Sequence, residues 1–589
     1  MNRSHRLNIG LSFAIAGTFI LAGLIVTFLI LYLSFTPEQI AMAYLPPGPL
    51  DPMILQQMIH QLGLDQPLFF QFFGYFFQFL FVDYGFSASI VQGMPVFVML
   101  VQYFPRLLEV LFLPLCIGVS LGYLFGRISN RSKRNWLKNM IQLLSALFLA
   151  IPVFLFGMYL QFTFGYLIPW FPTTGFKTYS FPNPPVITGS RIFDSMLSQQ
   201  WYLIPDTLYH YALPMIILTV AITALMTRFY SSNMIKDSYK KKSIFSRTAK
   251  TSAGFGVILT YFIMIDVTFG LNGFGSLLLM AIIYMDFFVI RGVLFTIIVW
   301  LAITLLVSNF VFSIYRGIKD LPPIEEQEDI TEREYDLSGK GEFRNYLKQI
   351  VKSPLTIIGI VAVLVPIVVS IIPELISGYS FQATLGVYMN QWGPPSPDHL
   401  LGKAQFGRDV LALISWGTAD AMLFGAMAIL IGLCGGLIFG LLASKLTRIV
   451  PTLIKIVMLV FYVLPAIVLV MLFVMSLGRE VWLLVLIIGL LLIPGFTRII
   501  ANTEFRILPI VKKIIAYAPL FAAFSILLYV SLGFLGFADS HTIQLGALMA
   551  QARVHLYDAP WASLWPGFMI FLILACLFLL HQGLVQHGR

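Results

Sequence analysis

Three carboxylates lie inside apolar runs of this sequence: Glu109, Asp266 and Asp420. An ionisable side chain is costly in lipid, so such residues usually face a cavity, a partner or an ion pathway. For Asp266 two roles are open: it lines or gates a pathway, or it is a structural carboxylate satisfied by hydrogen bonds. Glu109 and Asp420 lie close to the predicted outer ends of their runs. A proton relay would need several carboxylates in mid-membrane, and the sequence has too few.

No catalytic motif accompanies these carboxylates. The sequence contains no HExxH, no GxSxG, no phosphate-binding glycine loop followed by Lys-Ser/Thr and no paired histidine ligands. Its three cysteines, Cys116, Cys434 and Cys576, lie singly in apolar runs, and we interpret them as packing residues rather than metal or redox sites. We therefore expect no enzyme activity, and no catalytic, cofactor-binding or metal-ligating residue in this chain.

A row of glycines spaced four residues apart occurs twice, and the rest of the chain is organised around it. The first row is Gly118, Gly122 and Gly126, and the second is Gly432, Gly436 and Gly440. This spacing places the glycines on one helix face, where a second membrane helix can pack closely. A basic turn follows each row, and then a long apolar segment with one proline, Pro152 or Pro465. The matched flanks predict an internal duplication, and the two prolines join Asp266 as candidate pathway or gating residues.

Composition places most of this chain in a membrane. Of 589 residues, 58% are hydrophobic and 11% are charged, whereas a soluble domain has about 25% charged residues. The formal net charge is +10, but the positive residues cluster in short loops between apolar runs, which is topological information rather than a nucleic-acid surface. The first apolar run, Ile9 to Phe35, is too long for the core of a signal peptide and is expected to remain as an anchor.

The apolar runs predict an all-α polytopic membrane protein with about twelve transmembrane helices in two six-helix pseudo-repeats. Thr36 to Pro105 contains no Lys or Arg and is expected outside, while the basic loops after residues 126 and 227 are expected in the cytoplasm. Both termini are then cytoplasmic, in a bacterial plasma membrane. The predicted spans are 9–35, 107–126, 139–168, 209–227, 253–271, 290–315, 354–376, 417–443, 452–477, 481–497, 514–534 and 563–583.

A polar stretch over residues 316–352, rich in Asp and Glu, separates the two halves. We interpret it as a solvated cytoplasmic linker, with an acidic docking site for a basic partner as the alternative. The predicted domains are a membrane half over 1–320, an acidic linker over 321–350 and a second membrane half over 351–589. A Phe-rich run, Phe69 to Phe81, is expected to pack on the bilayer surface or against the helices.

The motifs of the first half resemble the B-type permease subunits of ABC transporters for dipeptides, oligopeptides and nickel. DVTFGLNGFG matches the family's acidic residue and glycine turn, with Asn272 where the family has a proline. The other matching motifs are LGLDQP, VDYGFS with Asp83, Gly85 and Ser87, Pro95-Val96, AIPVFLFG around Pro152, FPTTGF, and TRFYSSNM with Arg228.

The second half resembles the C-type permease of the same transporters, through PPSPDHLLGKAQFGRDVLALISWGTADAML, SLGFLGF and DAPWASLWPG. The resemblance covers nearly the whole chain and implies a fused B-type and C-type permease, similar in fold to type I ABC importers. It also implies two cytoplasmic ATPases, which bind ATP and Mg, and an extracytoplasmic substrate-binding protein. The candidate docking residues for that protein are Asp83, Gly85, Ser87, Gly407, Arg408 and Asp409. For Arg408 and Asp409 the alternative is a local charge pair that fixes the start of a helix.

The chain departs from the family where its ATPases should bind. The family has a Glu-Ala-Ala-x3-Gly type motif in a cytoplasmic loop of each half, and this motif is degenerate in KKKSIFSRTAKTSAGFG and in RIIANTEFRILPIVKK. Both loops are shortened, whereas a coupling helix needs about two turns at ~1.5 Å per residue. The candidate ATPase-facing residues are Tyr239, Lys240, Lys241, Lys242, Glu504 and Arg506.

Three hypotheses follow. The first is an ABC permease that moves peptides, or a similar small solute such as a nickel complex, by alternating access and is powered by separate ATPase subunits. The second is a permease fold reused as a membrane scaffold or an atypically coupled subunit, which the degenerate motifs favour. The third is a secondary transporter with two pseudo-symmetric halves, which the sparse charges in mid-membrane oppose. The sequence does not identify the solute.

Overall fold

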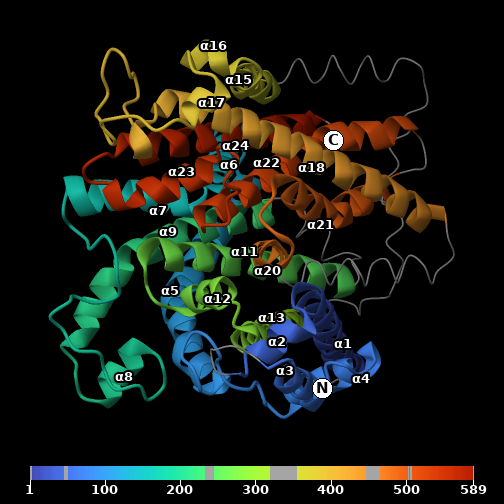
Figure 1. The fold of residues 1–589 in the computed structure, drawn as a ribbon. Helices are drawn as coiled ribbons and strands as arrows, with labels where there is room; N and C mark the ends of the chain where they lie inside the picture. Colours follow the sequence, from blue (N-terminus) through green and yellow to red (C-terminus); the bar gives the residue numbers. More distant parts are fainter. Residues whose placement is uncertain are drawn as a thin grey trace.

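The computed structural model describes residues 3–45, 51–231, 244–318, 354–445, 465–501, 503 and 507–587 (Figure 1). Throughout these ranges the chain forms helices, and two isolated bridges are the only β-pairing. The predicted all-α membrane class is therefore confirmed. The predicted linker over 321–350 lies outside the described residues.

The described residues of the first half form six long helical elements with shorter helices between them. The long elements are α1 (Arg3–Ser34), α5 (Val96–Arg131), α6 (Asn135–Ala150) with α7 (Val153–Gln161), α9 (Leu203–Ser231), α11 (Ile244–Phe269) with α12 (Phe274–Ile283), and α13 (Phe287–Ile318). The shorter ones are α2 (Pro37–Met42), α3 (Pro52–Gln61), α4 (Leu68–Leu80), the π-helix η1 (Phe162–Leu167) that continues α7, and α8 (Arg191–Leu197).

The second half repeats this order of long elements. Its long elements are α15 (Pro354–Ile371), α18 (Val410–Lys445), α20 (Ala466–Leu477), α21 (Val481–Ala501), α22 (Ile507–Phe534) and α24 (Trp561–His587). The shorter ones are α16 (Pro373–Ser377), α17 (Phe381–Thr384), α23 (Leu545–Ala552) and the 3-10 turns η2 (Gln405–Gly407) and η3 (Arg553–His555).

Among the described residues, eight helices are long and apolar enough to cross a membrane, or ten if each of two bent pairs counts as one span. The other two predicted spans correspond to α15 and α20, which are shorter and adjoin residues outside the described ranges. One predicted start was wrong: α5 begins at Val96 rather than at residue 107, and it contains Pro105 and Pro114. Proline is tolerated inside membrane helices because neighbouring groups satisfy the freed carbonyls.

The two halves are built on one packing pattern and interlock with each other. α5 packs against α9 as α18 packs against α21, and α1 packs against α13 as α15 packs against α24. Figure 1 shows α6 and α7 among the red helices of the second half, and the orange α20 beside the green helices of the first. Accordingly α6 and α7 contact α24, and α20 contacts α1, α11 and α12. We call all contacts between residues 3–318 and residues 354–587 the seam.

The two glycine rows lie at the contacts of α5 with α9 and of α18 with α21. A Cβ added at Gly122 would lie 2.4 Å from Cβ of Met226, and one at Gly436 would lie 2.3 Å from Cβ of Phe496. Real Cβ atoms do not approach so closely. The same arrangement at both places means that the absence of side chains sets the separation of each helix pair.

Widening one of these contacts should destabilise the protein. We expect Gly436→Val to lower the free energy of unfolding by about 1–3 kcal/mol, because overpacking a close contact forces the helices apart. Thermal unfolding of the purified chain in detergent measures this effect. The matched control is Gly17→Val, since Gly17 is also helical and an added Cβ there meets no atom within 4 Å. Equal losses for the two variants would contradict the prediction.

The Phe-rich run forms α4, which packs against α1 and α13. The hydroxyl of Tyr75 lies 2.6 Å from that of Thr27, and its ring packs edge-on against Phe295. The opposite face of α4 exposes Phe69, Phe70, Phe73 and Phe77, and Phe81, directly after the helix, is exposed as well. The predicted packing against the helices is thus confirmed.

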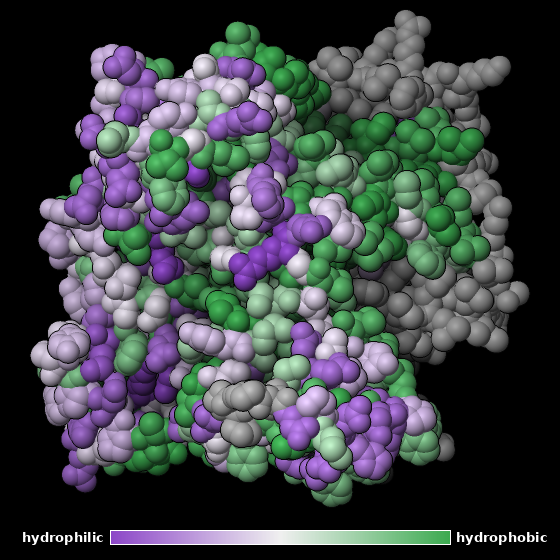
Figure 2. All heavy atoms as spheres, in the orientation of Figure 1, coloured by the Kyte–Doolittle hydropathy of each residue, from purple (hydrophilic) through white to green (hydrophobic). Residues whose placement is uncertain are grey.

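On the visible surface, hydrophilic residues gather at the upper left, near the loop between α17 and α18, and hydrophobic ones cover α18 and α21 at the upper right (Figure 2).

Candidate functional site

A hairpin from Gly85 to Val96 sets the start of α5. We call it the first outer hairpin, because it lies in the segment that the sequence predicts to be outside. The N–H of Val96 donates to the carbonyl of Gly85 (2.9 Å), and the N–H of Ser87 donates to the carbonyl of Met94 (2.8 Å). Gly85 and Gly93 have φ values of +76° and +78°, a conformation that glycine adopts without strain. The candidate docking residues Gly85 and Ser87 therefore belong to the frame of this hairpin.

The second outer hairpin, Gly402 to Val410, has the same frame and sets the start of α18. The N–H of Val410 donates to the carbonyl of Gly402 (3.0 Å), and the N–H of Ala404 donates to the carbonyl of Arg408 (2.8 Å). Gly402 and Gly407 have φ values of +79° and +69°. These bonds and glycines match those of the first outer hairpin one for one, although the connecting loops differ in length. When Val96 is aligned with Val410, the glycines of the first row align with those of the second. The duplication therefore includes both the glycine rows and the backbone hydrogen bonds of the hairpins.

A residue that sequence reasoning missed, Asp286, holds the first outer hairpin. One of its carboxylate oxygens accepts hydrogen bonds from the hydroxyl of Ser87 (2.7 Å) and from the next three backbone N–H groups at 3.1, 3.0 and 3.3 Å. Its other oxygen accepts from the N–H of Val289 (3.3 Å) and so caps α13. The carboxylate is completely buried. An acidic residue directly before an apolar run is a helix-start signal, and that signal could have identified it.

Asp83 lies outside this network. It is exposed at the entrance to the first outer hairpin, and its backbone N–H donates to the carbonyl of Gln78 at the end of α4 (3.0 Å). Its carboxylate is therefore placed on the surface and is available to a partner, whereas Ser87 is buried against Asp286. The sequence had placed both residues in one candidate docking set, and the structure separates them.

The second outer hairpin is fastened by its own charged residues. The guanidinium of Arg408 donates to the carbonyls of Leu385 (2.7 Å) and Gly386 (3.0 Å). Asp409 accepts from the N–H of Ala412 (2.8 Å), which caps α18, and its other oxygen lies 2.9 Å from Nδ1 of His399. The alternative of a charge pair between Arg408 and Asp409 is therefore wrong, although Asp409 does fix the start of a helix.

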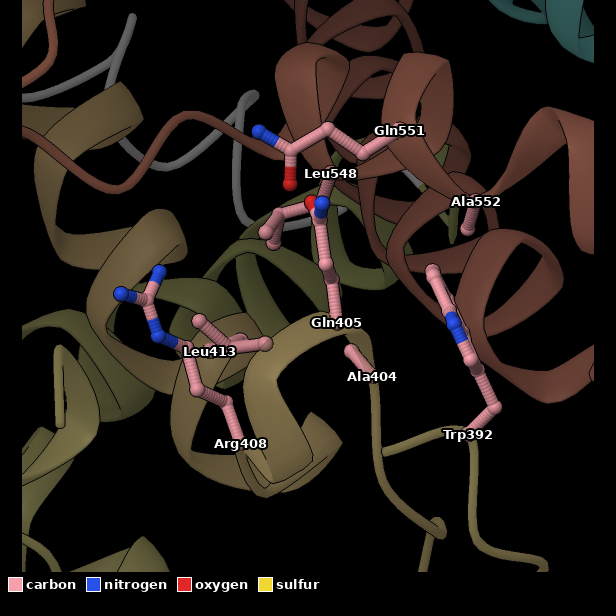
Figure 3. A pocket seen from close by; sticks show the side chains of 8 residues that line it. All are labelled: Trp392, Ala404, Gln405, Arg408, Leu413, Leu548, Gln551 and Ala552. Carbon is pink, nitrogen blue, oxygen red and sulfur yellow. The ribbon is translucent and has the colours of Figure 1, made fainter. Parts of the chain in front are cut away.

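A cavity of about 10 Å³, enough for about one water, lies behind this hairpin. Figure 3 shows Trp392 and Arg408 on opposite sides of it, with Gln405 reaching toward the helix that carries Leu548 and Gln551. The ring of Trp392 stacks on His555 at 4.3 Å between centroids. This cavity is too small for a solute, so the outer hairpin is a packed surface rather than a binding pocket.

The seam is closed by an aromatic stack at the break between α6 and α7. These helices are bent by 86° at Pro152, which has no N–H to continue the helix. Phe154, just after the bend, stacks on Phe534 at the end of α22 with ring centroids 4.4 Å apart, and both rings are buried. Pro465 precedes α20 as Pro152 precedes α7. The two candidate prolines therefore begin the helices that cross into the opposite half.

Polar contacts also join the two halves. The hydroxyl of Tyr159 donates to the carbonyl of Leu564 on α24 (2.8 Å). From the second half, the guanidinium of Arg553 donates to the carbonyl of Val267 (3.2 Å). On α9, the guanidinium of Arg228 donates to Oε1 of Gln582 on α24 (2.6 Å). In this conformation the halves are in contact at several levels of the seam.

Asp266 lies next to the seam but faces its own helix turn. Its carboxylate is fully buried and accepts hydrogen bonds from the backbone N–H of Gly273 (2.9 Å) and of Ser276 (2.7 Å) at the start of α12. Asn272, which replaces the family's proline, has a φ of +52° in the same turn. This is the geometry of the structural alternative, a carboxylate that fixes the 80° bend between α11 and α12.

The other two intramembrane carboxylates also have defined partners. Glu109 accepts from the backbone N–H groups of Arg191 (3.2 Å) and Ile192 (2.5 Å) at the start of α8. Asp420 accepts from the hydroxyl of Tyr529 (2.5 Å), and the Tyr529 ring stacks on Phe424. Each carboxylate therefore joins two elements of one half. No cluster of three or more metal-ligating side chains occurs among the residues that the structure describes.

Comparison with known proteins shows which proteins this chain is similar to. Residues 118–238 match the family of binding-protein-dependent transport system inner membrane components. The chain is 27% identical over 268 residues to a dipeptide transport system permease protein, DppC, of Alkalihalophilus pseudofirmus, which covers 41% of this chain and 88% of the relative. It is 24% identical over 300 residues to a di/tripeptide transport system permease protein, DppB, of Pseudomonas aeruginosa, which covers 47% of this chain and 87% of the relative. The chain is therefore similar to the membrane components of binding-protein-dependent transport systems.

This permease is thus a multi-pass protein of the plasma membrane. Its candidate ATPase-facing residues, Tyr239 to Lys242, Glu504 and Arg506, lie outside the described residues. The helices around them are described, and in the second half α21 ends at Ala501 and α22 begins at Ile507. The candidates Glu504 and Arg506 therefore lie between the ends of these two helices.

Proposed function

We propose that this chain is the complete transmembrane unit of a peptide ABC transporter, with a B-type and a C-type permease joined in one polypeptide. Its similarity to a DppB and to a DppC, each nearly full-length in the relative but under half of this chain, supports the fusion. The names of these relatives support dipeptides or short peptides as the solute class. The chain would supply the pathway, while separate ATPase subunits bind ATP and Mg.

The observation that carries this proposal is the pair of equivalent outer hairpins above an interlocked seam. Two halves with the same frame can tilt against each other about a closed contact, which is what alternating access requires. The stack of Phe154 on Phe534 would close the pathway in the conformation described here. The exposed outer surface, with Asp83 on one hairpin and the loop around Met389 beside the other, would receive a substrate-binding protein.

In the second half, ATPase coupling would use the residues between the end of α21 and the start of α22, where the sequence places the candidates Glu504 and Arg506. The similarity to peptide permeases favours the permease over a scaffold or a secondary transporter. We therefore keep ATP-driven import as the function, with both termini on the cytoplasmic side.

Purification of the tagged chain from its native membrane tests this function. We expect an ATPase pair and a binding protein to be purified with it, and we expect proteoliposomes that contain the complex to accumulate dipeptides when ATP is supplied to the ATPase side. A chain that is purified alone, or uptake that follows an ion gradient and ignores ATP, would contradict the proposal.

The second outer hairpin offers a sharper test. A Cβ at Gly407 would lie 2.5 Å from the carbonyl oxygen of Tyr388, and φ there is +69°. We expect Gly407→Ala to lower uptake and binding-protein association at least about tenfold, since a distortion that costs ~1.4 kcal/mol or more corresponds to this factor. The matched control is Gly378→Ala, where φ is +72° but an added Cβ meets no atom within 4 Å. Uptake that is equal in the two variants would contradict a role for this hairpin in docking.

A further inference from the structure

The segment Val186–Tyr202, which we call the α8 lobe, has its polar side chains inside and its apolar side chains outside. Arg191, Asp194 and Ser195 on α8 are all at most 6% exposed. On the opposite side of the same helix, Phe193 and Leu197 are 61% and 58% exposed. A short helix that faced water would have the reverse arrangement. The surroundings of this lobe are therefore apolar.

Internal hydrogen bonds satisfy the buried polar groups of the lobe. Asp194 accepts from the N–H (2.6 Å) and the hydroxyl (2.7 Å) of Thr188 and from the N–H of Gly189 (3.1 Å). The guanidinium of Arg191 reaches into the helices and donates to the hydroxyl of Tyr211 (2.9 Å) and to the carbonyl of Leu271 (2.9 Å). Arg191 and Asp194 are the only charged residues between 186 and 202. The exposed surface of the α8 lobe consequently carries no charge.

The exposed face continues directly into the lipid-facing side of a transmembrane helix. Trp201 and Tyr202, 57% and 54% exposed, immediately precede α9. On α9 itself the exposed residues recur at helical spacing and include Leu208, Tyr209 and Ile216. Trp and Tyr are enriched where membrane helices meet the headgroup region. The α8 lobe thus lies at the depth of that region and on the same side as the lipid contact of α9.

We propose that the α8 lobe is an interfacial membrane contact, which inserts Phe193, Leu197 and Trp201 into the outer leaflet. The occupant of this face is lipid rather than a partner protein, because the face is uncharged, is rimmed by Trp and Tyr, and continues the exposed side of a span. Through Arg191 the lobe also holds the turn after α11, so the lipid contact positions the turn in which Asp266 caps α12. This inference depends on the membrane location of the chain and on nothing about its solute.

Spin labels on single cysteines test the contact in the full chain, reconstituted in nanodiscs of phosphatidylethanolamine and phosphatidylglycerol. The background carries alanine at Cys116, Cys434 and Cys576. Labels are placed at Phe193→Cys and Leu197→Cys, with Ile216→Cys as the lipid reference and Met389→Cys, in the exposed outer loop of the second half, as the aqueous reference. The readout is the collision rate of each label with oxygen, which concentrates in lipid, relative to a water-soluble nickel chelate.

We expect the oxygen-to-nickel ratio at positions 193 and 197 to exceed that at position 389 several-fold and to approach that at position 216. A ratio equal to that at position 389 would overturn the proposal, because the face would then lie in water. Low collision rates with both reagents would also overturn it, because a protein partner would then cover the face. All four positions are surface residues, so the substitutions leave the core intact, and these readings do not depend on transport.

Discussion

Cross-linking Phe154→Cys to Phe534→Cys is expected to reduce solute uptake to background. The two rings stack across the seam at 4.4 Å, and each belongs to a different half. If the halves separate at this level in every transport cycle, a short covalent bridge holds the pathway in the closed conformation. The experiment uses the chain with its three native cysteines replaced by alanine, a short cleavable thiol cross-linker and ATP-driven dipeptide uptake in proteoliposomes.

The controls distinguish the effect of the covalent bridge on uptake from the effect of removing the two aromatic rings. Each single cysteine variant, treated with the same reagent, should retain the uptake that it shows untreated. Cleavage of the linker should restore uptake in the double variant. Quantitative cross-linking with unchanged uptake would contradict movement at this stack, and it would place the pathway elsewhere along the seam.

The duplication could be predicted because its signal depends only on the spacing of residues that are close together in the sequence. A glycine at every fourth residue allows a close contact between two helices in lipid. The rows that contain Gly122 and Gly436 therefore predict two equivalent helix contacts, and no knowledge of the fold is needed. The start of α5 was not predictable in this way. In the sequence, Pro105 indicates a helix boundary. In the structure, however, α5 begins at Val96 and continues through Pro105.

At the candidate site, the sequence indicates the backbone conformation of the hairpins, but it does not indicate which polar groups hold them in place. The hairpin glycines stand out in sequence because positive φ favours glycine. Which groups fasten each hairpin depends on residues far away in the chain, such as Asp286, which lies 199 residues after Ser87. The role of Asp266 depended on whether nearby N–H groups pointed at it, and a sequence pattern does not contain that information.

The halves also differ where their backbones agree. In the register of the hairpins Arg106 stands where the second half has Asp420. Arg106 donates to the carbonyl of Asn272 (2.8 Å), whereas Asp420 accepts from the hydroxyl of Tyr529. The duplicated frame is therefore symmetric, while the polar contacts that join its helices are not.

Replacing Asp286 by alanine is expected to destabilise the permease on the order of 3–5 kcal/mol. The variant leaves the buried hydroxyl of Ser87 and three part-buried backbone N–H groups without their acceptor. An unsatisfied buried donor costs ~1–3 kcal/mol, and a part-buried one costs less because water reaches it. It also removes the cap at the start of α13. Ser87→Ala keeps the carboxylate but removes one donor to it and the acceptor of the N–H of Val91 (3.1 Å), and should cost about 1–2 kcal/mol.

Thermal unfolding in detergent and hydrogen exchange of the amides of residues 88–90 measure this effect. We expect Asp286→Ala to raise the exchange rate of these amides while those in the middle of α5 stay protected, because the hairpin loses its anchor before the helix loses its packing. Asp286→Asn keeps the shape but not the charge, so it should fall between the alanine variant and the native chain. If Asp286→Ala and Ser87→Ala lost the same stability, the carboxylate would not be the common acceptor, and the first outer hairpin would be held by its own backbone bonds alone.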